Sequence, residues 1–258
     1  MAQPARTDRE ILDRAGVNDI DTILDISRAN PDANAVVHAV QDNSKALFTW
    51  DYAKGARPKL ERLYEKAKTS QWNAETDLDW SIEVDPYEAF SVFSESDFTP
   101  EFHNQRALPT DSWGEAEWRE FSLESFKWRM SQFLHGEQGA LLCTAKIVET
   151  VPWIDAKYYA ATQVVDEARH VEVFGKYIDT KLGDSYPINV HLKLLLDDII
   201  NDSRWDMTYL GMQIMVEGLA LAAFGFMHQL TPEPLLKQLL RYVMADEARH
   251  VAFGVLSL

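Results

Sequence analysis

The chain has 258 residues, of which 46% are hydrophobic and 26% are charged. This composition excludes a disordered or collagen-like protein and predicts a globular fold with a substantial buried core. Acidic residues outnumber basic ones by 41 to 25, so the average surface repels phosphate backbones and anionic lipid headgroups. We therefore expect no nucleic-acid partner.

The single cysteine, Cys143, excludes an internal disulfide and any site built from several thiolates. The first ten residues lack the apolar stretch that defines a secretory signal. Both observations predict a protein of the reducing cytoplasm.

Residues 1–110 are predicted to form an N-terminal extension that is rich in loops and wraps the core. Prolines are scattered through this region, and only residues 59–70 show clear helical spacing, with Leu60, Leu63, Tyr64 and Ala67 on one face. Residues 71–80 alternate aromatic and polar side chains without a clear period. We expect this segment to lie against the rest of the protein.

Residues 111–258 are predicted to form an all-α four-helix bundle. Helical periodicity covers 110–150, with a possible interruption near Ser122, and then 152–182, 191–201, 205–230 and 235–258. Pro152 and Pro232 are each expected to open a helix, because proline is tolerated in a first helical turn. No segment after residue 110 alternates as a strand would, so the prediction is four long helices and one connector.

Residues 209–230 are apolar and long enough to cross a membrane. This segment contains Gln213, Glu217 and His228, however, and an ionisable residue in the middle of a membrane span is costly. In a bundle, a metal ion can neutralise a buried glutamate. We therefore expect a buried helix and no membrane partner.

An internal repeat with an offset of eighty residues runs through the helical region. Residues 166–171 recur identically as 246–251, both reading DEARHV. The same offset pairs Glu137 with Glu217 and Pro152 with Pro232. Each half of the region is therefore predicted to be a helical hairpin of the same design.

The repeated motif places Glu167 three residues before His170, and Glu247 three residues before His250. Residues at this spacing lie one helical turn apart on the same face, so each pair can bind one metal site. A single copy of this spacing is weak evidence, because it occurs by chance in many helices. Two copies, each preceded by a glutamate in an apolar helix, are much more specific.

The four glutamates of the repeat carry a charge that the neighbouring cations cannot balance. Buried carboxylates cost several kcal/mol each unless they are neutralised, and Arg169 and Arg249 are the only well-placed cations. Two divalent ions would balance four carboxylates. Oxygen donors with two imidazoles favour iron or manganese over zinc or copper, and this ligand pattern is that of di-iron and di-manganese carboxylate bundles.

From about residue 121 onward the sequence resembles the ferritin-like di-iron carboxylate superfamily. The doubled DEARH motif is most similar to that of hydroxylase subunits of bacterial multicomponent monooxygenases, and the chain also resembles arylamine N-oxygenases. The resemblance implies one iron held by Glu137, Glu167 and His170 and a second held by Glu217, Glu247 and His250. It also implies that Glu167 and Glu247 bridge the two ions.

The resemblance further implies that aspartates orient the ligand histidines. Asp166 and Asp246 would each accept a hydrogen bond from the histidine of the opposite hairpin, and Arg169 and Arg249 would hold the aspartates. Ordinary surface charge on a helix is the alternative explanation for these four residues. An apolar pocket beside the metals is expected from the following residues: Phe133, Leu141, Phe174, Leu221 and Phe224.

Three positions separate this chain from individual relatives. Phe174 stands where radical-generating reductase subunits place a tyrosine, Leu221 where the hydroxylases generally have a threonine, and Val243 where arylamine N-oxygenases have an extra ligand histidine. The ligand set alone also leaves an iron-handling ferroxidase, or a manganese-containing ligand-binding relative, as alternatives.

The function expected from the resemblance is that of an O₂-activating di-iron oxygenase. Such an enzyme would hydroxylate or N-oxygenate a small organic substrate with two iron ions, one or both of which manganese could replace. No flavin or iron–sulfur motif is present in the sequence, so an external reductase or ferredoxin is expected to supply electrons. We also expect a homodimer.

Overall fold

The computed structural model describes residues 40–50, 52–90 and 113–258, and all regular structure in these ranges is helical. The elements are α3 (Pro58–Thr69), α4 (Pro86–Ala89), α5 (Glu115–Thr150), α6 (Ile154–Tyr177), η4 (Ile178–Leu182), α7 (Val190–Asn201), α8 (Trp205–Thr208), η5 (Tyr209–Val216), α9 (Glu217–Leu230) and α10 (Pro234–Ser257). The predicted all-α fold is confirmed. The predicted domain boundary at 110/111 lies outside the described residues.

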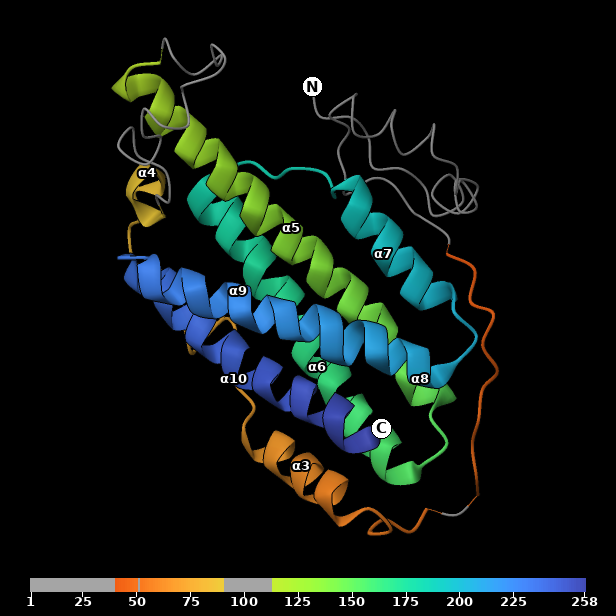
Figure 1. Cartoon of the computed structure of the whole chain (residues 1–258). Coiled ribbons are helices and arrows are strands. Elements are labelled where there is room, and N and C mark those ends of the chain that lie inside the picture. The colour runs from red at the N-terminus through yellow and green to blue at the C-terminus, as the bar shows by residue number, and fades with distance from the viewer. Residues whose placement is uncertain (1–39, 51, 91–112) are drawn as a thin grey trace, which may run out of the picture.

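Four long helical rods form the bundle: α5, α6, the continuous run of α8, η5 and α9, and α10 (Figure 1). α5 and α6 make one hairpin and α9 and α10 make the other, as the eighty-residue repeat predicts. α7 is the connector between the hairpins and packs on the outside of α5.

The helices differ from the sequence-based expectation in four details. α5 begins at Glu115, after the non-helical residues 113 and 114, rather than near residue 110. α5 runs through Ser122 without a break, and this serine is buried in the helix packing. α10 starts at Pro234 rather than Pro232, because the Glu233 carboxylate accepts hydrogen bonds from the backbone N–H groups of Leu235 and Leu236 and so caps the helix. Pro152 likewise lies outside α6, which begins at Ile154.

The third rod contains a long π-helical segment that the sequence does not reveal. η5 spans eight residues and ends directly before Glu217. Its neighbour α10 comes very close, since a Cβ atom added at Gly254 would lie 2.7 Å from the Cβ atom of Gln213. A glycine is therefore needed at this crossing. π-Helical turns within α-helices frequently occur at functional sites.

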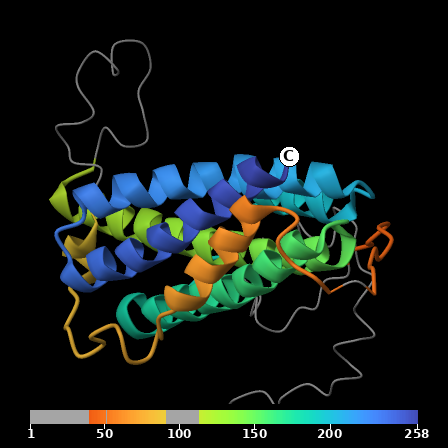
Figure 2. The ribbon, with the colours of Figure 1, turned by 90° about the horizontal axis from the view of Figure 1, so that it is seen from below.

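The described part of the N-terminal region packs on the bundle. α3 crosses α6 and α10 on their outer face (Figure 2) and buries Leu60 and Ala67. After α3, the side chains of Trp72 and Leu78 are buried in the same apolar cluster as Phe126 and Phe174. The aromatic segment 71–80 therefore contributes to the core of the bundle.

The helix from Trp205 to Leu230 is the one candidate membrane span among the described residues by length and composition. In the structure it packs on α10 and α5 and buries Glu217, Phe224 and Met227 in the bundle. Only 28% of its most apolar window is buried. The expectation of a buried helix is therefore correct for one face only, and the opposite face is apolar and exposed.

Candidate metal centre

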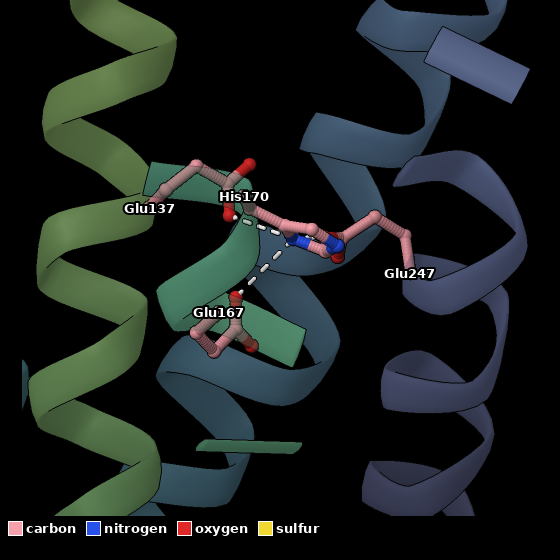
Figure 3. Close-up of side chains that lie close together, drawn as sticks. All are labelled: Glu137, Glu167, His170 and Glu247. Carbon is pink, nitrogen blue, oxygen red and sulfur yellow. Dashed lines mark hydrogen bonds and ion pairs between the residues drawn. The ribbon is translucent and has the colours of Figure 1, made fainter. Parts of the chain in front are cut away.

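The six residues singled out in the repeat meet in the centre of the bundle. Figure 3 shows Glu137 from α5, Glu167 and His170 from α6, and Glu247 from α10 with their side chains converging between the helices. Glu217, the first residue of α9, and His250 of α10 complete the cluster. None of the six is more than 5% exposed.

One half of the cluster is centred on the Nδ1 atom of His170. This nitrogen lies 3.1 Å from Glu247 Oε1 and 3.2 Å from Glu137 Oε2. Glu167 Oε2 lies 3.6 Å from the same nitrogen. Three carboxylates from three helices therefore converge on one imidazole.

The other half is centred on the Nδ1 atom of His250. Its neighbours are Glu167 Oε1 at 3.3 Å and, at 3.4 Å each, Glu217 Oε2 and Glu247 Oε2. Glu167 and Glu247 thus present one oxygen to each histidine, whereas Glu137 faces only His170 and Glu217 faces only His250. Glu167 and Glu247 would therefore serve both of two ions, and Glu137 and Glu217 would serve one ion each.

Several atoms of the cluster are buried without a hydrogen-bond partner. These atoms are Glu167 Oε2, both carboxylate oxygens of Glu247 and His250 Nδ1. Their closest neighbours are other ligand-type atoms that point toward the same spaces. Because unpaired buried polar atoms are costly, this geometry fits cations between them. Two groups can each hold a metal ion, their ligand atoms lying within 4.8 Å of one another: Glu137, Glu167, His170 and Glu247; and Glu167, Glu217 and His250.

In the metal-free cluster the surroundings raise the pKa values of Glu137, Glu167 and Glu217 and so favour their protonation. Burial raises the pKa of Glu137 to about 7. Burial and the neighbouring Glu247 carboxylate raise the pKa of Glu217 to about 8. Burial alone would lower the pKa of His170, but the facing Glu137 carboxylate helps to raise it well above its usual value. Metal ions must therefore displace protons from this site.

Two aspartates fix the outward-facing nitrogens of the ligand histidines. His170 Nε2 lies 3.2 Å from Asp246 Oδ2, and His250 Nε2 lies 3.4 Å from Asp166 Oδ2. Each aspartate thus contacts the histidine of the opposite hairpin, and this contact directs Nδ1 toward the metal positions. Hydrogen bonding to His170 outweighs burial and holds the pKa of Asp246 well below its usual value.

The two arginines of the repeat bind both aspartates. Arg169 donates to Asp246 at 2.9 Å and Arg249 donates to Asp166 at 3.1 Å, and each arginine also pairs with the aspartate three residues before it. All four side chains are at most 7% exposed. They form a buried charged layer over the histidines. The alternative explanation of these four residues as ordinary surface charge is therefore excluded.

The segment after α3 supplies two further contacts to this layer that the sequence does not indicate. Trp72 Nε1 donates to Asp246 at 2.8 Å, and Gln71 Nε2 donates to Asp166 at 3.0 Å. The Arg169 guanidinium lies over the Trp72 ring, 4.7 Å from its centroid. No spacing rule connects residues in a loop with motifs 95 and 174 positions later, so no sequence signal could have identified them.

An apolar cavity of about 280 Å³ adjoins the cluster between α5, α7 and α9. Glu137 and Glu217 lie in its wall, and the remaining lining residues are Gln132, Phe133, Gly136, Ala140, Leu192, Leu195, Val216, Leu219, Ala220, Ala223 and Phe224. Of the expected pocket residues, Phe133 and Phe224 line the cavity. Phe174 lies behind them, 5.5 Å from the Phe224 ring centroid.

Leu141 and Leu221 do not line this cavity, contrary to expectation. The cavity is lined by one side of α9, which carries Leu219, Ala220, Ala223 and Phe224, and at about 100° per residue Leu221 falls outside the arc that these four residues span. On α5 the wall is formed by Phe133, Gly136 and Ala140 rather than by Leu141. The remaining wall comes from α7, whose leucines were assigned only to a connector.

Comparisons with known proteins identify similar structures but no sequence family. No protein-family model matches the chain, and no curated protein matches it. A variant of an R2-like ligand-binding oxidase with an anaerobically reconstituted Mn/Fe cofactor aligns with a TM-score of 0.57 and 22% identity, over 80% of this chain and 72% of the other. A second variant gives 0.55 and 21%, over 80% and 73%.

A third variant of the same oxidase, also with a reconstituted Mn/Fe cofactor, aligns with a TM-score of 0.54 and 22% identity, over 80% of this chain and 70% of the other. The alignments cover most of both chains. The chain has the ferritin-like fold. At 21–22% identity the likeness establishes the fold alone. The ligands and the Mn/Fe cofactor belong to those oxidases.

Proposed function

We propose that this ferritin-like protein is an O₂-activating oxidoreductase with two metal ions that acts on a small apolar organic molecule. One observation carries the proposal: Glu137 and Glu217 belong both to the metal cluster and to the wall of the apolar cavity. A molecule in the cavity would therefore lie directly beside the metals. Apart from these two glutamates, Gln132 is the one polar side chain in this wall, so the wall offers few ligands to a transiting metal ion, which argues for an oxidase rather than an iron-handling protein.

The metal pair is proposed to be two iron ions or one manganese and one iron. The carboxylate-rich donor set favours these metals, and the structurally similar R2-like oxidases carry Mn/Fe cofactors. Bound in this site, the pair would supply the redox chemistry that reduces O₂. The aspartates keep each histidine Nε2 hydrogen-bonded so that Nδ1 is free to bind metal, and the phenylalanine wall keeps water away from the substrate.

We further propose hydroxylation or N-oxygenation as the reaction, with electrons from a separate reductase or ferredoxin. The apolar cavity selects an uncharged substrate of modest size. The charged layer of aspartates and arginines lies on the far side of the histidines from the carboxylates, so it can hold the ligands without contacting that substrate.

Filling the cavity tests this proposal. We expect Ala220→Phe to leave the metal content at the wild-type value and to reduce substrate-dependent O₂ consumption at least tenfold, because the added ring occupies much of the cavity. The measurement is O₂ uptake by reduced, iron-loaded protein with a panel of small aromatic amines and alkylbenzenes, with product detection by mass spectrometry. Ala161→Phe, at an exposed position of α6, is the matched control.

Turnover of the panel by the cavity-filled variant at the wild-type rate would contradict the assignment of the cavity. Wild-type protein that binds two ions but oxidises no member of the panel, and consumes only the O₂ needed to oxidise its own metals, would contradict the oxygenase proposal.

A homodimer is proposed to form through the exposed face of the third rod. Four large apolar side chains follow one stripe of η5 and α9, and they are 47–70% exposed: Met215, Leu219, Phe226 and Leu230. A twofold axis can pair such a stripe with itself, and the stripe carries no charge that would oppose this contact. A membrane is the other surface that could cover this stripe, but the net charge of −16 is repelled by anionic lipid headgroups.

Charging this stripe should separate the protomers. We expect Met215→Glu combined with Phe226→Glu to raise the dimer dissociation constant at least a hundredfold, as measured by analytical ultracentrifugation. Val255→Glu, which changes a 62% exposed residue of α10, is the control. A wild-type monomer, or a charged variant that remains dimeric, would exclude this interface.

A further inference from the structure

Gln163 is a buried polar residue that contacts two metal ligands and has no role in the expected ligand set. It lies on α6, four residues before Glu167, and is fully buried. Its Nε2 donates to Glu167 Oε1 at 2.7 Å and to Glu217 Oε1 at 3.2 Å. One amide thus connects a bridging-type carboxylate of the first hairpin with a terminal carboxylate of the second.

The second half of the repeat lacks this amide. The eighty-residue offset pairs Gln163 with Val243, which is equally buried but has no side-chain donor. The carboxylate of Glu137, the repeat counterpart of Glu217, lies 3.2 Å from His170 Nδ1, which is itself an atom of the cluster. The two halves are therefore identical in their metal-ligand residues and different in what holds those ligands.

The contacts of Gln163 are all with one metal position. The oxygen of Glu167 that it holds is the one facing His250, at 3.3 Å from Nδ1. By holding Oε1 of Glu217 it leaves Oε2 of that residue directed at the same nitrogen. The Glu217–His250 position is consequently organised before a metal arrives, and the Glu137–His170 position lacks this support.

We infer that Gln163 is a positioning residue that makes the two metal positions unequal, so that the first divalent ion binds at Glu217 and His250. Side chains that are already held lose less conformational freedom when they bind an ion. Residues that support metal ligands commonly change metal affinity by about 10- to 100-fold. This inference rests on the two-metal site of the proposed function, and it deepens that function by setting an order of loading.

The first test titrates the metal-free full-length chain with Mn²⁺ alone and measures the binding steps by calorimetry. The second locates the ion by anomalous diffraction from crystals that hold one equivalent of Mn²⁺. We expect two binding steps, and the single ion at the Glu217–His250 position. In Gln163→Leu we expect the affinity of the first step to fall about 10- to 100-fold and the single equivalent to be divided between both positions. A purely structural role of Gln163 would lower the melting temperature without moving the ion.

Two further variants keep the result unambiguous. Gln213→Leu removes another fully buried glutamine, one whose amide has no hydrogen-bond partner, and should leave both steps unchanged. Val243→Gln places an amide in the second half and should bring the two affinities closer together, which gives a readout even if Gln163→Leu fails to fold.

The possible failures have different meanings. Wild-type protein that binds no Mn²⁺ would refute the two-metal site itself. Two ions bound with equal affinity, or a first ion at the Glu137–His170 position, would overturn the inference about Gln163 and leave the two-metal site in place. The inference about Gln163 would also be overturned if Gln163→Leu bound Mn²⁺ with the wild-type affinities and with the single ion at the wild-type position.

Discussion

Replacing Glu247 by alanine is expected to reduce the metal content from two ions per chain to less than one. The two oxygens of Glu247 face His170 Nδ1 at 3.1 Å and His250 Nδ1 at 3.4 Å, so a single substitution removes a ligand from both positions. The remaining glutamates also lose the cations that neutralise them. The measurement is elemental analysis by mass spectrometry after anaerobic loading with Fe²⁺ and removal of free metal.

The size of the effect should depend on which glutamate is replaced. Of the two histidines of the cluster, Glu137 faces His170, so we expect Glu137→Ala to retain about one ion per chain, at the Glu217–His250 position. Glu172→Ala changes an exposed glutamate of α6 and should bind as much metal as the wild type. Unchanged stoichiometry in Glu247→Ala would refute its assignment as a shared ligand.

The part of the centre that could be predicted from the sequence is the part that the repeat encodes. Glu167 and His170 lie one turn apart on a helix wherever that helix is placed, and the identical second motif predicts a partner of the same geometry. Cations are then required, because a bundle interior cannot hold four ionised carboxylates without them. Fold and cluster both follow from local spacing and elementary electrostatics.

Residues brought in by distant segments could not be predicted in this way. Trp72 reaches Asp246 across 174 positions of sequence, and nothing in a loop marks such a contact. Gln163 could not be singled out from the repeat either, because between 154 and 165 the eighty-residue offset matches only Lys157 with Lys237. The Gln163/Val243 difference is one of many in this stretch, and only the structure shows that the amide contacts two glutamates of the cluster.

The cavity was predicted only in part, for a geometric reason. Leu141 and Leu221 each follow a glutamate of the cluster by four residues, but the wall runs along the other side of that glutamate, through Ala140 on α5 and Ala220 on α9. The wall contributed by Leu192 and Leu195 comes from α7, whose packing against α5 is a tertiary feature. Periodicity identifies apolar faces but does not say which neighbour meets them.

The metal-free protein is expected to lose stability as the pH rises, which is the reverse of the behaviour of most acidic proteins. The pKa of a glutamate is about 4.3 in an unfolded chain, whereas burial raises the pKa of Glu137 to about 7 and that of Glu217 to about 8 in the folded protein. The folded chain therefore binds protons more tightly than the unfolded chain. The contribution of these two glutamates to the free energy of unfolding is fully present below about pH 4.3. It is lost as the pH rises toward 8.

The histidines act in the same direction. The facing carboxylates outweigh burial and raise the pKa values of His170 and His250 well above the usual value, so their contribution is also lost at high pH. For Glu217 alone the loss between pH 5.5 and 8.5 is on the order of 3 kcal/mol, since each pH unit below its folded-state pKa of about 8 is worth about 1.4 kcal/mol. The paired aspartates, whose pKa values are lowered, titrate below this window.

Metal should invert this dependence, because ions bind the deprotonated ligands and compete better as protons leave. We expect the melting temperature of the metal-free chain to fall by about 10 °C or more from pH 5.5 to 8.5, and that of the Mn²⁺-loaded chain to rise over the same range. Circular dichroism melts with chelator or with excess Mn²⁺ measure both slopes. Glu217→Gln, which removes one titrating carboxylate, should reduce the fall of the melting temperature with pH in the metal-free chain.

A metal-free chain whose stability instead rose with pH would contradict this prediction. It would show that some other group already neutralises the buried carboxylates, and two metal ions would then not be needed to balance their charge.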